Sequence, residues 1–418
     1  MKMNNIQEPR NTHQQKTSLS KGVKVVLGFA LVIFIGSVGF LFGYSTPRTI
    51  KPAQLPTVIE KAFSKTDDAD KIDISIFETV WNQVQTNYLR KNKVSVTDEY
   101  YGILKGLMAS LGDPYSVFFN PKETQEFAND LAGSFEGIGA EISIREEKLV
   151  IVTPLKGSPA EEVGLQPNDV IFKIDGEMTD YLDLETAVSK IRGPEDSTVL
   201  LTIIRGDAEP KDYTVIRKTI KIDSVHEEVS DGIATITLTS FNDDTIKELD
   251  SAVQDILLKD PKGIILDLRN NPGGLLDVSV KVANVFLPTG SVVVIERAGD
   301  GAKTTHKTTT DGKLKQIPLV VLVNEGSASA AEIVAGALKD LDRAKLVGEK
   351  TFGKGTVQTY EVLPDGSSLK LTIAEWLTPL GDSFDGAGIE PDTVVEMTNE
   401  DYTNDRDPQM DQALQELQ

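Results

Sequence analysis

The chain has 418 residues, 64 acidic against 43 basic side chains, a formal net charge of −21 and no cysteine. This length predicts roughly two or three domains. The charge argues against nucleic-acid binding, which needs a basic footprint, and is typical of an exposed protein kept soluble by its charge. The lack of cysteine excludes disulfides, thiolate nucleophiles and Cys-based zinc sites.

A long uncharged segment lies near the N-terminus, at residues 25–44, "VVLGFALVIFIGSVGFLFGY". As a helix it is about 30 Å long, the thickness of a bilayer's hydrocarbon core. The lysines that precede it favour a cytoplasmic N-terminus. We therefore expect a cytoplasmic tail at 1–21 and a single transmembrane anchor at 22–44. The rest of the chain would lie outside the cell membrane, in a periplasm or at the cell exterior. A cleaved signal peptide is the alternative, but its apolar region is shorter and no small-residue cleavage site follows.

The next two segments are a polar linker at 45–70 and a helical region at 71–131. The linker combines Thr, Pro, Lys and Asp with few apolar residues. Helical periodicity marks the segments "ISIFETVWNQVQTNYL", "DEYYGILKGLMASLG" and "KETQEFANDLAG". No chemistry is evident in this region. Packing, a substrate gate and pairing with a second copy as a homodimer all stay open.

Residues 132–210 change to short strands and helices whose order resembles a PDZ domain. The segments "KLVIVTPL", "PNDVIFKIDG" and "STVLLTIIRG" indicate strands, and "DLETAVSKIRG" indicates an amphipathic helix. The loop "EGIGAEI" would present Gly137, Ile138 and Gly139 to a peptide carboxylate, the mode of strand addition and terminal capture. The alternative is that these glycines are ordinary turn residues.

Residues 211–395 alternate buried strands with amphipathic helices, which predicts an α/β core. Two strand ends attract interest. "DLRNNPGG" brings the N–H groups of Gly273 and Gly274 to a helix N-terminus, suitable for an oxyanion hole; a plain turn is equally consistent. "NEGSASAAEI" places Ser327 and Ser329 at a strand-to-helix turn, where a serine more often serves only as a helix cap.

A nucleophilic serine needs a base, and none of the three histidines lies in a promising segment. "GEKTFGKGT" resembles a phosphate-binding loop but lacks Ser or Thr directly after Lys354. Lowering a lysine pKa from about 10.4 to about 7 costs ~4–5 kcal/mol, and burial without an adjacent carboxylate can do this. Lys354 is flanked by glycines and followed by the neutral Gln358, so it is a candidate base.

These motifs together resemble the C-terminal processing peptidases, which are tail-specific Ser-Lys proteases. The matching segments are "LMASLGDPYS", "GSFEGIGAEI", "GSPAEEVGLQPNDVIFKIDG", "DLRNNPGG", "NEGSASAAEIVAGAL", "GEKTFGKGTVQ" and "LTIAEWLTPLGDSFDGAGIEPD", in the family's order over residues 70–395. The resemblance implies a crotonase-like or Clp-protease-like ββα core with an inserted PDZ domain, an α+β multidomain protein of the α/β class. It implies Ser329 as nucleophile, Lys354 as general base and Gln358 as the residue that orients the base. Ala331 departs from the serine expected there.

The resemblance further implies an oxyanion hole formed by the N–H of Ala330 with that of Gly273 or Gly274. Arg192 is the candidate sensor of a bound carboxylate. The expected partners are protein or peptide substrates with unstructured C-termini. The N-terminal helix is expected to contact the membrane, and no cofactor, metal or nucleic acid is required. An inactive PDZ scaffold and a nucleotide-binding protein are the rival functions. The segment at 396–418 is acidic, and we expect it to be a frayed tail.

Overall fold

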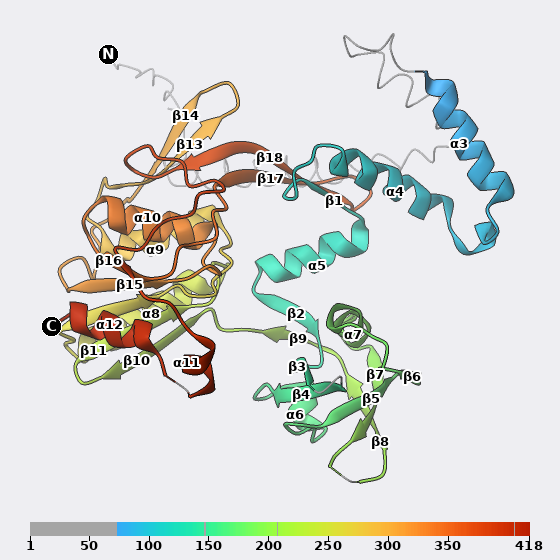
Figure 1. The fold of residues 1–418 in the computed structure, drawn as a ribbon, viewed down its shortest axis with the longest axis horizontal. Helices are drawn as coiled ribbons and strands as arrows, with labels where there is room; N and C mark the ends of the chain where they lie inside the picture. Colours follow the sequence, from blue (N-terminus) through green and yellow to red (C-terminus); the bar gives the residue numbers. More distant parts are fainter. Residues whose placement is uncertain (1–72, 146–147, 207, 405) are drawn as a thin grey trace, which may run out of the picture. The chain divides into compact units, whose positions relative to one another are not determined.

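The computed structural model describes residues 73–418, except 146–147, 207 and 405 (Figure 1). The chain divides into two compact units, one ending at Tyr100 and one running from Tyr101 to Gln418. The predicted anchor and linker lie outside the described residues. Within the described ranges, no helix combines the length and the apolar character that crossing a bilayer requires.

The first unit is built from short helices, as its periodicity predicts. Helix α3 (Ile74–Asn87) is capped by Asp73, whose side chain accepts the N–H of Ser75. A short 3₁₀ turn, η3 (Lys91–Lys93), and the start of helix α4 (Val96–Ala109) follow. No residue of α3 is buried, and Ile76 and Val80 on its apolar stripe are largely exposed.

The second unit opens with the end of α4, strand β1 (Val117–Phe119) and helix α5 (Pro121–Leu131). Helix α5 starts with a reciprocal capping box between Asn120 and Glu123. Strand β1 pairs antiparallel with strand β18 (Ser368–Leu377), far along the chain. The turn before β1, which contains Tyr115, is thereby held against the C-terminal half of the protein.

The PDZ-like segment forms its own antiparallel sheet with a separate apolar core. An antiparallel ribbon of β2 (Ser134–Gly137) and β9 (Lys218–Lys221) carries the chain into and out of it. The sheet order is β3-β4-β5-β7-β8, with β6 beside β5. The elements are β3 (Ala140–Arg145), β4 (Lys148–Pro154), α6 (Pro159–Glu162), β5 (Val170–Ile174), β6 (Glu177–Met178), α7 (Leu184–Ile191), β7 (Thr198–Ile204) and β8 (Lys211–Ile216).

The α/β core is a six-stranded sheet in the order β10-β11-β12-β15-β16-β19. Only the pair β10–β11 is antiparallel. Strands β12 and β15 are buried along their whole length, as their apolar runs predict. The elements are β10 (Val225–Ser230), β11 (Ile233–Leu238), α8 (Thr245–Leu258), β12 (Gly263–Asp267), α9 (Leu276–Phe286), β15 (Leu319–Val323), α10 (Ala330–Asp340), β16 (Lys345–Gly348) and β19 (Thr393–Val394). Residues of α8, α9 and α10 pack in one large apolar cluster with this sheet.

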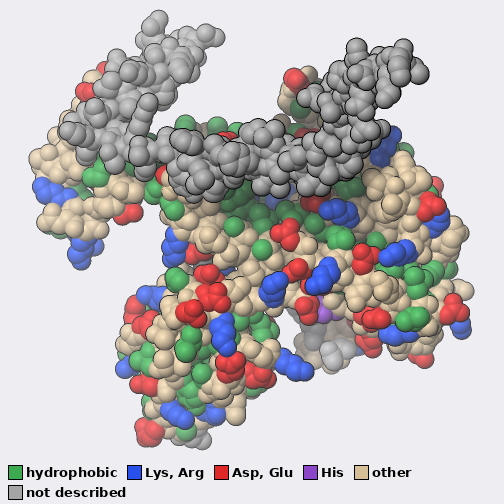
Figure 2. Space-filling view, turned by 180° about the vertical axis from the view of Figure 1, so that it is seen from behind, with side chains coloured by type: hydrophobic (Ala, Val, Ile, Leu, Met, Phe, Trp, Pro, Cys, Tyr) green, Lys and Arg blue, Asp and Glu red, His purple; other side chains and the backbone are tan. Residues whose placement is uncertain are grey.

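A second sheet contains β1, β18, β13 (Val292–Ala298) and β14 (Lys303–Lys307), with β17 (Thr356–Val362) paired to β18. Strand β17 follows the loop that carries Lys354, so this sheet determines where that loop ends. On the face drawn in Figure 2, basic side chains are interspersed with acidic ones over the described surface.

The expectation of a frayed tail at 396–418 is wrong. Helix α11 (Asn399–Thr403) is followed by α12 (Pro408–Glu416), which packs against β15 and β16 (Figure 1). Ala413 is fully buried there, in an apolar cluster on the sheet face. Other apolar residues of the segment that pack on this cluster are Met410, Leu414 and Leu417. Their helical spacing within an acidic sequence is the signal that composition alone obscured.

Candidate active site

The candidate site lies where three adjacent parallel strands end. The loops that follow β12, β15 and β16 meet at the carboxyl edge of the sheet, the usual location of sites in α/β folds. Backbone hydrogen bonds join them: the N–H of Ala328 donates to the carbonyl of Asn271 at 2.9 Å. The N–H of Phe352 donates to the carbonyl of Ser327 at 3.0 Å. The glycine, serine and lysine motifs are therefore one connected structure.

Ser329 occupies a sharp turn between β15 and α10. Its φ is 54° and its ψ is −113°, a conformation that a non-glycine residue rarely adopts. Such backbone strain costs about 1–3 kcal/mol and persists only where surrounding contacts enforce it. The turn leaves the side chain half-buried at the N-terminus of α10, much as a strained strand-to-helix turn exposes the nucleophile in other hydrolases.

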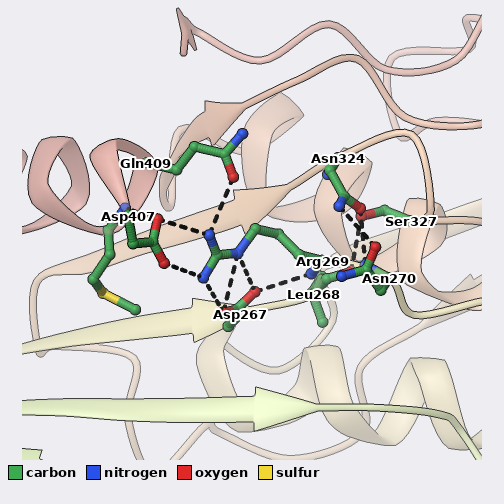
Figure 3. Close-up of polar contacts among 9 residues, drawn as sticks. Asp267, Leu268, Arg269, Asn270, Asn324, Ser327, Asp407 and Gln409 are labelled. Carbon is green, nitrogen blue, oxygen red and sulfur yellow. Dashed lines mark hydrogen bonds and ion pairs between the residues drawn. The ribbon is translucent and has the colours of Figure 1, made fainter. Parts of the chain in front are cut away.

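Ser327 is a structural residue. It is fully buried, its hydroxyl donates to the carbonyl of Leu268 at 2.8 Å, and it accepts the N–H of Asn324 at 3.0 Å (Figure 3). The hydroxyl thus connects the loop after β15 (the serine loop, residues 324–329) to the loop after β12 (the glycine loop, residues 268–275). Of the two serines in the motif, only Ser329 is placed to meet a substrate.

Glu332 connects the serine turn to the lysine loop. Its carboxylate is fully buried and accepts four hydrogen bonds, two at each oxygen, which uses the full acceptor capacity of the group. Oε2 accepts the N–H of Ser329 at 2.9 Å and that of Lys354 at 2.8 Å. Oε1 accepts the N–H of Gly353 at 2.7 Å and the hydroxyl of Thr351 at 2.6 Å. One side chain therefore fixes the backbone of both candidate catalytic residues.

Lys354 is half-buried, and its Nζ lies 5.0 Å from the centroid of the Tyr115 ring. Burial lowers the pKa of Lys354, and the nearby Glu332 carboxylate offsets part of that effect. The direction of this shift is the one that a lysine base requires. Among the described residues no hydrogen bond joins the Lys354 amine to the Ser329 hydroxyl, so the amine rests on the aromatic ring.

Gln358 lies on strand β17, four residues after Lys354. Its amide Nε2 donates to the hydroxyl of Thr356 at 2.8 Å and to that of Thr372 at 3.3 Å. These threonines fix the orientation of the amide. In the described part of the chain it forms no hydrogen bond to Lys354, so its orienting role stays a prediction.

The predicted oxyanion donors surround the serine turn. A Cβ added to Gly273 would lie 2.8 Å from Cβ of Ser329 and 2.9 Å from the amide nitrogen of Ala330, so only glycine fits there. The N–H of Gly273 donates to the side chain of Asn271 at 2.9 Å. Over the described ranges, the N–H groups of Ala330 and Gly274 have no such partner. Gly273 lies closer to Ser329, whereas within the described residues the N–H of Gly274 is free to donate, so the choice between the two glycines stays open.

Comparison with known proteins gives the same assignment as the sequence motifs. Residues 232–395 match peptidase family S41, and residues 150–205 match a PDZ domain. A probable CtpA-like serine protease of Staphylococcus haemolyticus (strain JCSC1435) is 38% identical over 387 residues, which cover 92% of this chain and 76% of the relative. The corresponding protein of Staphylococcus aureus (strain MRSA252) is 38% identical over 339 residues, covering 81% and 68%.

The chain belongs to peptidase family S41. It is a serine protease with a PDZ domain, so the predicted resemblance is confirmed. Among solved structures, the photosystem II D1 C-terminal processing protease is similar to it, with a TM-score of 0.51 and 29% identity over 83% of this chain and 94% of that chain. A putative S41 protease from Bacteroides fragilis NCTC 9343 shares the fold, with a TM-score of 0.51, 19% identity and coverage of 77% and 90%.

In the PDZ domain of the protease, the structure brings the predicted loop and arginine together. Arg192 caps the C-terminus of α7, and its Cγ lies 3.7 Å from the position of a Cβ added to Gly137. Its guanidinium stacks 4.9 Å from the centroid of the Phe135 ring, beside a cavity of about 260 Å³. Ile138 is buried in the PDZ core, and Gly139 packs against Ser158. Peptide binding by these residues stays a prediction.

Sequence reasoning missed three residues of the site. Glu332 stands three places after Ser329, and this Ser-x-x-Glu spacing is a capping-box signal that could have identified it. Asn271 is fully buried and holds the glycine turn through its side chain, donating to the carbonyl of Leu238 at 2.7 Å. Tyr115 is 239 positions from Lys354 in the chain, as the numbering shows, and no local pattern connects them.

Proposed function

We propose that this S41 protease is a membrane-anchored serine endopeptidase that cleaves protein substrates near their C-termini through a Ser-Lys dyad. The observation that carries the proposal is the shared Glu332 carboxylate, which holds the backbones of Ser329 and Lys354 at one point. The lowered pKa of Lys354 supports the same chemistry, because a lysine accepts a proton only as the neutral amine.

In the proposed reaction, the Ser329 hydroxyl attacks the scissile carbonyl while the neutral Lys354 amine takes its proton. The resulting ammonium then donates that proton to the leaving amine, and the acyl-enzyme forms. Water, deprotonated by the same lysine, releases the product. Lys354 must first swing from the Tyr115 ring towards the hydroxyl. Gln358, held by Thr356 and Thr372, orients the amine after this movement.

The tetrahedral intermediate places negative charge on the former carbonyl oxygen. The N–H of Ala330, at the first residue of α10, lies at the positive end of that helix and stabilises this charge. A glycine N–H supplies the second hydrogen bond. If Gly273 is the donor, its N–H must leave the side chain of Asn271; Gly274 needs no such change.

The PDZ domain would select the substrate by its tail. An extended C-terminal peptide adds along the edge strand β3, with its carboxylate near the PDZ loop at 137–139. Arg192 lies beside that loop and is exposed, so it can meet the carboxylate. The similar D1 protease is described as a C-terminal processing enzyme, and we propose the same class of substrate here.

The same proposal includes a single-pass anchor and a dimer. The uncharged run at 25–44 supports an uncleaved anchor with a cytoplasmic N-terminus, which leaves the catalytic body on the extracytoplasmic side of the cell membrane. The exposed apolar stripe of α3, including Ile76, Val80 and Val84, supports pairing of the helical region with a second copy. Val80→Glu should convert a dimer to a monomer in light scattering of the detergent-solubilised chain.

The test uses the full chain in detergent with an unfolded substrate carrying an apolar C-terminal tail. Wild-type protein should cleave the free-acid form faster than the C-terminally amidated form, and Ser329→Ala should cleave neither. Arg192→Ala should lose the preference for the free acid while retaining basal cleavage. Equal cleavage of acid and amide by wild type would contradict tail recognition, and cleavage by Ser329→Ala would contradict the nucleophile.

A further inference from the structure

The C-terminal helix α12 is connected to the glycine loop through one arginine, as Figure 3 shows. Arg269 is the second residue after strand β12, four residues before Gly273, and its side chain is only 15% exposed. On one side the guanidinium binds Asp267, with Nη2 2.7 Å from Oδ2 and Nε 3.0 Å from Oδ1. On the other side it reaches helix α12.

The contact with α12 involves two residues. Nη1 of Arg269 donates to Asp407 at 3.0 Å and to the side-chain oxygen of Gln409 at 3.1 Å, and Nη2 lies 2.9 Å from the second oxygen of Asp407. Gln409 is fully buried, and its amide donates in turn to the carbonyl of Val395. Paired contact of a guanidinium with a carboxylate fixes both distance and plane.

The residues on either side of Arg269 contact the serine loop. The carbonyl of Leu268 accepts the hydroxyl of Ser327, and the N–H of Asn270 donates to the side chain of Asn324 at 2.8 Å. A continuous series of polar contacts thus runs from α12 through residues 268–270 to the turn that precedes Ser329. The same backbone continues into Asn271, whose side chain holds Gly273.

We propose that Asp407, with Gln409, is a positioning residue for catalysis, which acts through Arg269 to hold the oxyanion side of the site. This inference rests on the proposed function, because it takes Ser329 and the neighbouring N–H groups as the reacting centre. Asp407 touches neither of them. Helix α12 is then a support for the glycine loop as well as a cover for the sheet.

The contribution of the Asp407–Arg269 ion pair can be tested without removing the cap of helix α12. Asp407 also caps α12, accepting the N–H of Met410 at 2.9 Å. Asparagine caps a helix about as well as aspartate, so Asp407→Asn removes the charge and keeps the cap. Arg269 remains paired with Asp267 and is not left as an isolated buried cation.

Helix α12 also supplies a matched control at its other end. Glu416 forms a 2.8 Å ion pair with Lys345 and accepts from Thr393 at 3.1 Å, and none of these residues contacts Arg269. Glu416→Gln therefore loosens the same helix by the same kind of change, without touching the glycine loop. A merely structural role of α12 predicts the same behaviour from both variants.

The experiment measures kcat and KM for an unfolded substrate, together with hydrogen exchange of residues 268–275, on the full chain in detergent. Asp407→Asn should lower kcat about ten-fold, leave KM within about two-fold and speed exchange in this loop. The pH profile should not move, because the surroundings of Lys354 are unchanged. Glu416→Gln should match wild type in all of these. If Asp407→Asn folds poorly, Gln409→Ala serves as the second variant, with the same expected changes.

Equal kcat and equal loop exchange in Asp407→Asn and Glu416→Gln would overturn the inference. A fall in kcat without faster exchange in the loop would also overturn it, because the proposed route through Arg269 would be absent. Ser329→Ala in the same series separates this failure from failure of the proposed function. Cleavage that persists in Ser329→Ala would contradict the dyad, whatever Asp407→Asn shows, and the exchange result would still decide the connection to α12.

Discussion

A single carboxylate oxygen of Glu332, Oε2, receives both the N–H of Ser329 at 2.9 Å and the N–H of Lys354 at 2.8 Å. The two residues come from different loops, so their relative position depends on this contact. A fully buried carboxylate that accepts four hydrogen bonds is also hard to replace. The relative position of Ser329 and Lys354 and the stability of the fold therefore both depend on Glu332.

We expect Glu332→Gln to lower both stability and activity. The amide presents donors where the carboxylate accepted, so buried N–H groups lose their partners at a cost of roughly 2–5 kcal/mol. Denaturant unfolding should show this loss, and kcat should fall by about a hundred-fold or more as the two loops separate. Asp385→Asn is the matched control: Asp385 accepts the N–H of Gly355 in the same loop but is exposed. Unchanged kcat in Glu332→Gln would contradict the positioning role.

The ring of Tyr115 should control the pH dependence of activity. Burial is the largest cause of the lowered Lys354 pKa, whereas a cation–π contact with the ring favours the protonated form by only about 0.5–2 kcal/mol. Tyr115→Ala admits water and should raise the pKa of Lys354 towards its ordinary value of 10.5. Because only the neutral amine accepts a proton, the alkaline rise in kcat/KM should then move to higher pH.

Tyr115→Phe keeps the ring and the exclusion of water, so its pH profile should match that of wild type. A shift of the Tyr115→Ala profile towards acid would mean that the cation–π contact outweighs burial at this site. The profile of kcat/KM across pH 6–10 distinguishes the two outcomes.

Burial of Lys354 should make the native protein less stable at neutral pH than a variant without the charge. The folded-state pKa lies below the unfolded value of 10.5, so the unfolded chain binds more protons between these two values and stability rises with pH in that window. At a pH below the folded-state pKa of Lys354, the native protein carries the full free-energy cost of the buried charge. Lys354→Met should therefore raise the free energy of unfolding at pH 7, with a gain that disappears above about pH 10.5. A gain independent of pH would contradict burial of the charge.

The two serines of the motif should behave in opposite ways. Ser327→Ala removes a buried hydroxyl that holds Leu268 and Asn324, so thermal or denaturant unfolding should report a loss of about 1–3 kcal/mol. Cleavage should persist at a reduced rate. Ser329→Ala should abolish cleavage. Because it removes no buried hydrogen bond of the described structure, it should leave stability near that of wild type. The reverse pattern would assign the nucleophile to Ser327.

Much of the fold could be read from local patterns. The buried strands β12 and β15 are continuous apolar runs. Helices α5, α8 and α9 show helical periodicity, and α5 also has a recognisable start in its capping box. The hairpin of β13 and β14 was not anticipated, because β14 reads "KTTHK" and is mostly exposed. The strand structure of β14 comes from its pairing with β13, which itself pairs with β18, rather than from its own residues.

The residues of the candidate site that belong to short sequence motifs could be predicted. The contacts between residues far apart in the chain could not. Their spacing alone makes Ser329 and Lys354 candidates, and the resemblance to the C-terminal processing peptidases implies their roles, which stay predictions. The contact of Lys354 with Tyr115 and that of Arg269 with Asp407 join residues far apart in the chain. Helix α12 was misjudged because its many acidic and polar residues concealed the apolar stripe that packs on the sheet.

The most direct test of the central claim is the rate of casein cleavage by the full chain in detergent, measured from pH 6 to pH 9 for wild type, Ser329→Ala and Lys354→Met. The Ser-Lys dyad predicts that wild-type activity rises with pH through a single ionisation, as the Lys354 amine loses its proton. Both variants should be inactive across the range while remaining folded by circular dichroism. Activity that persists in either folded variant would contradict the dyad.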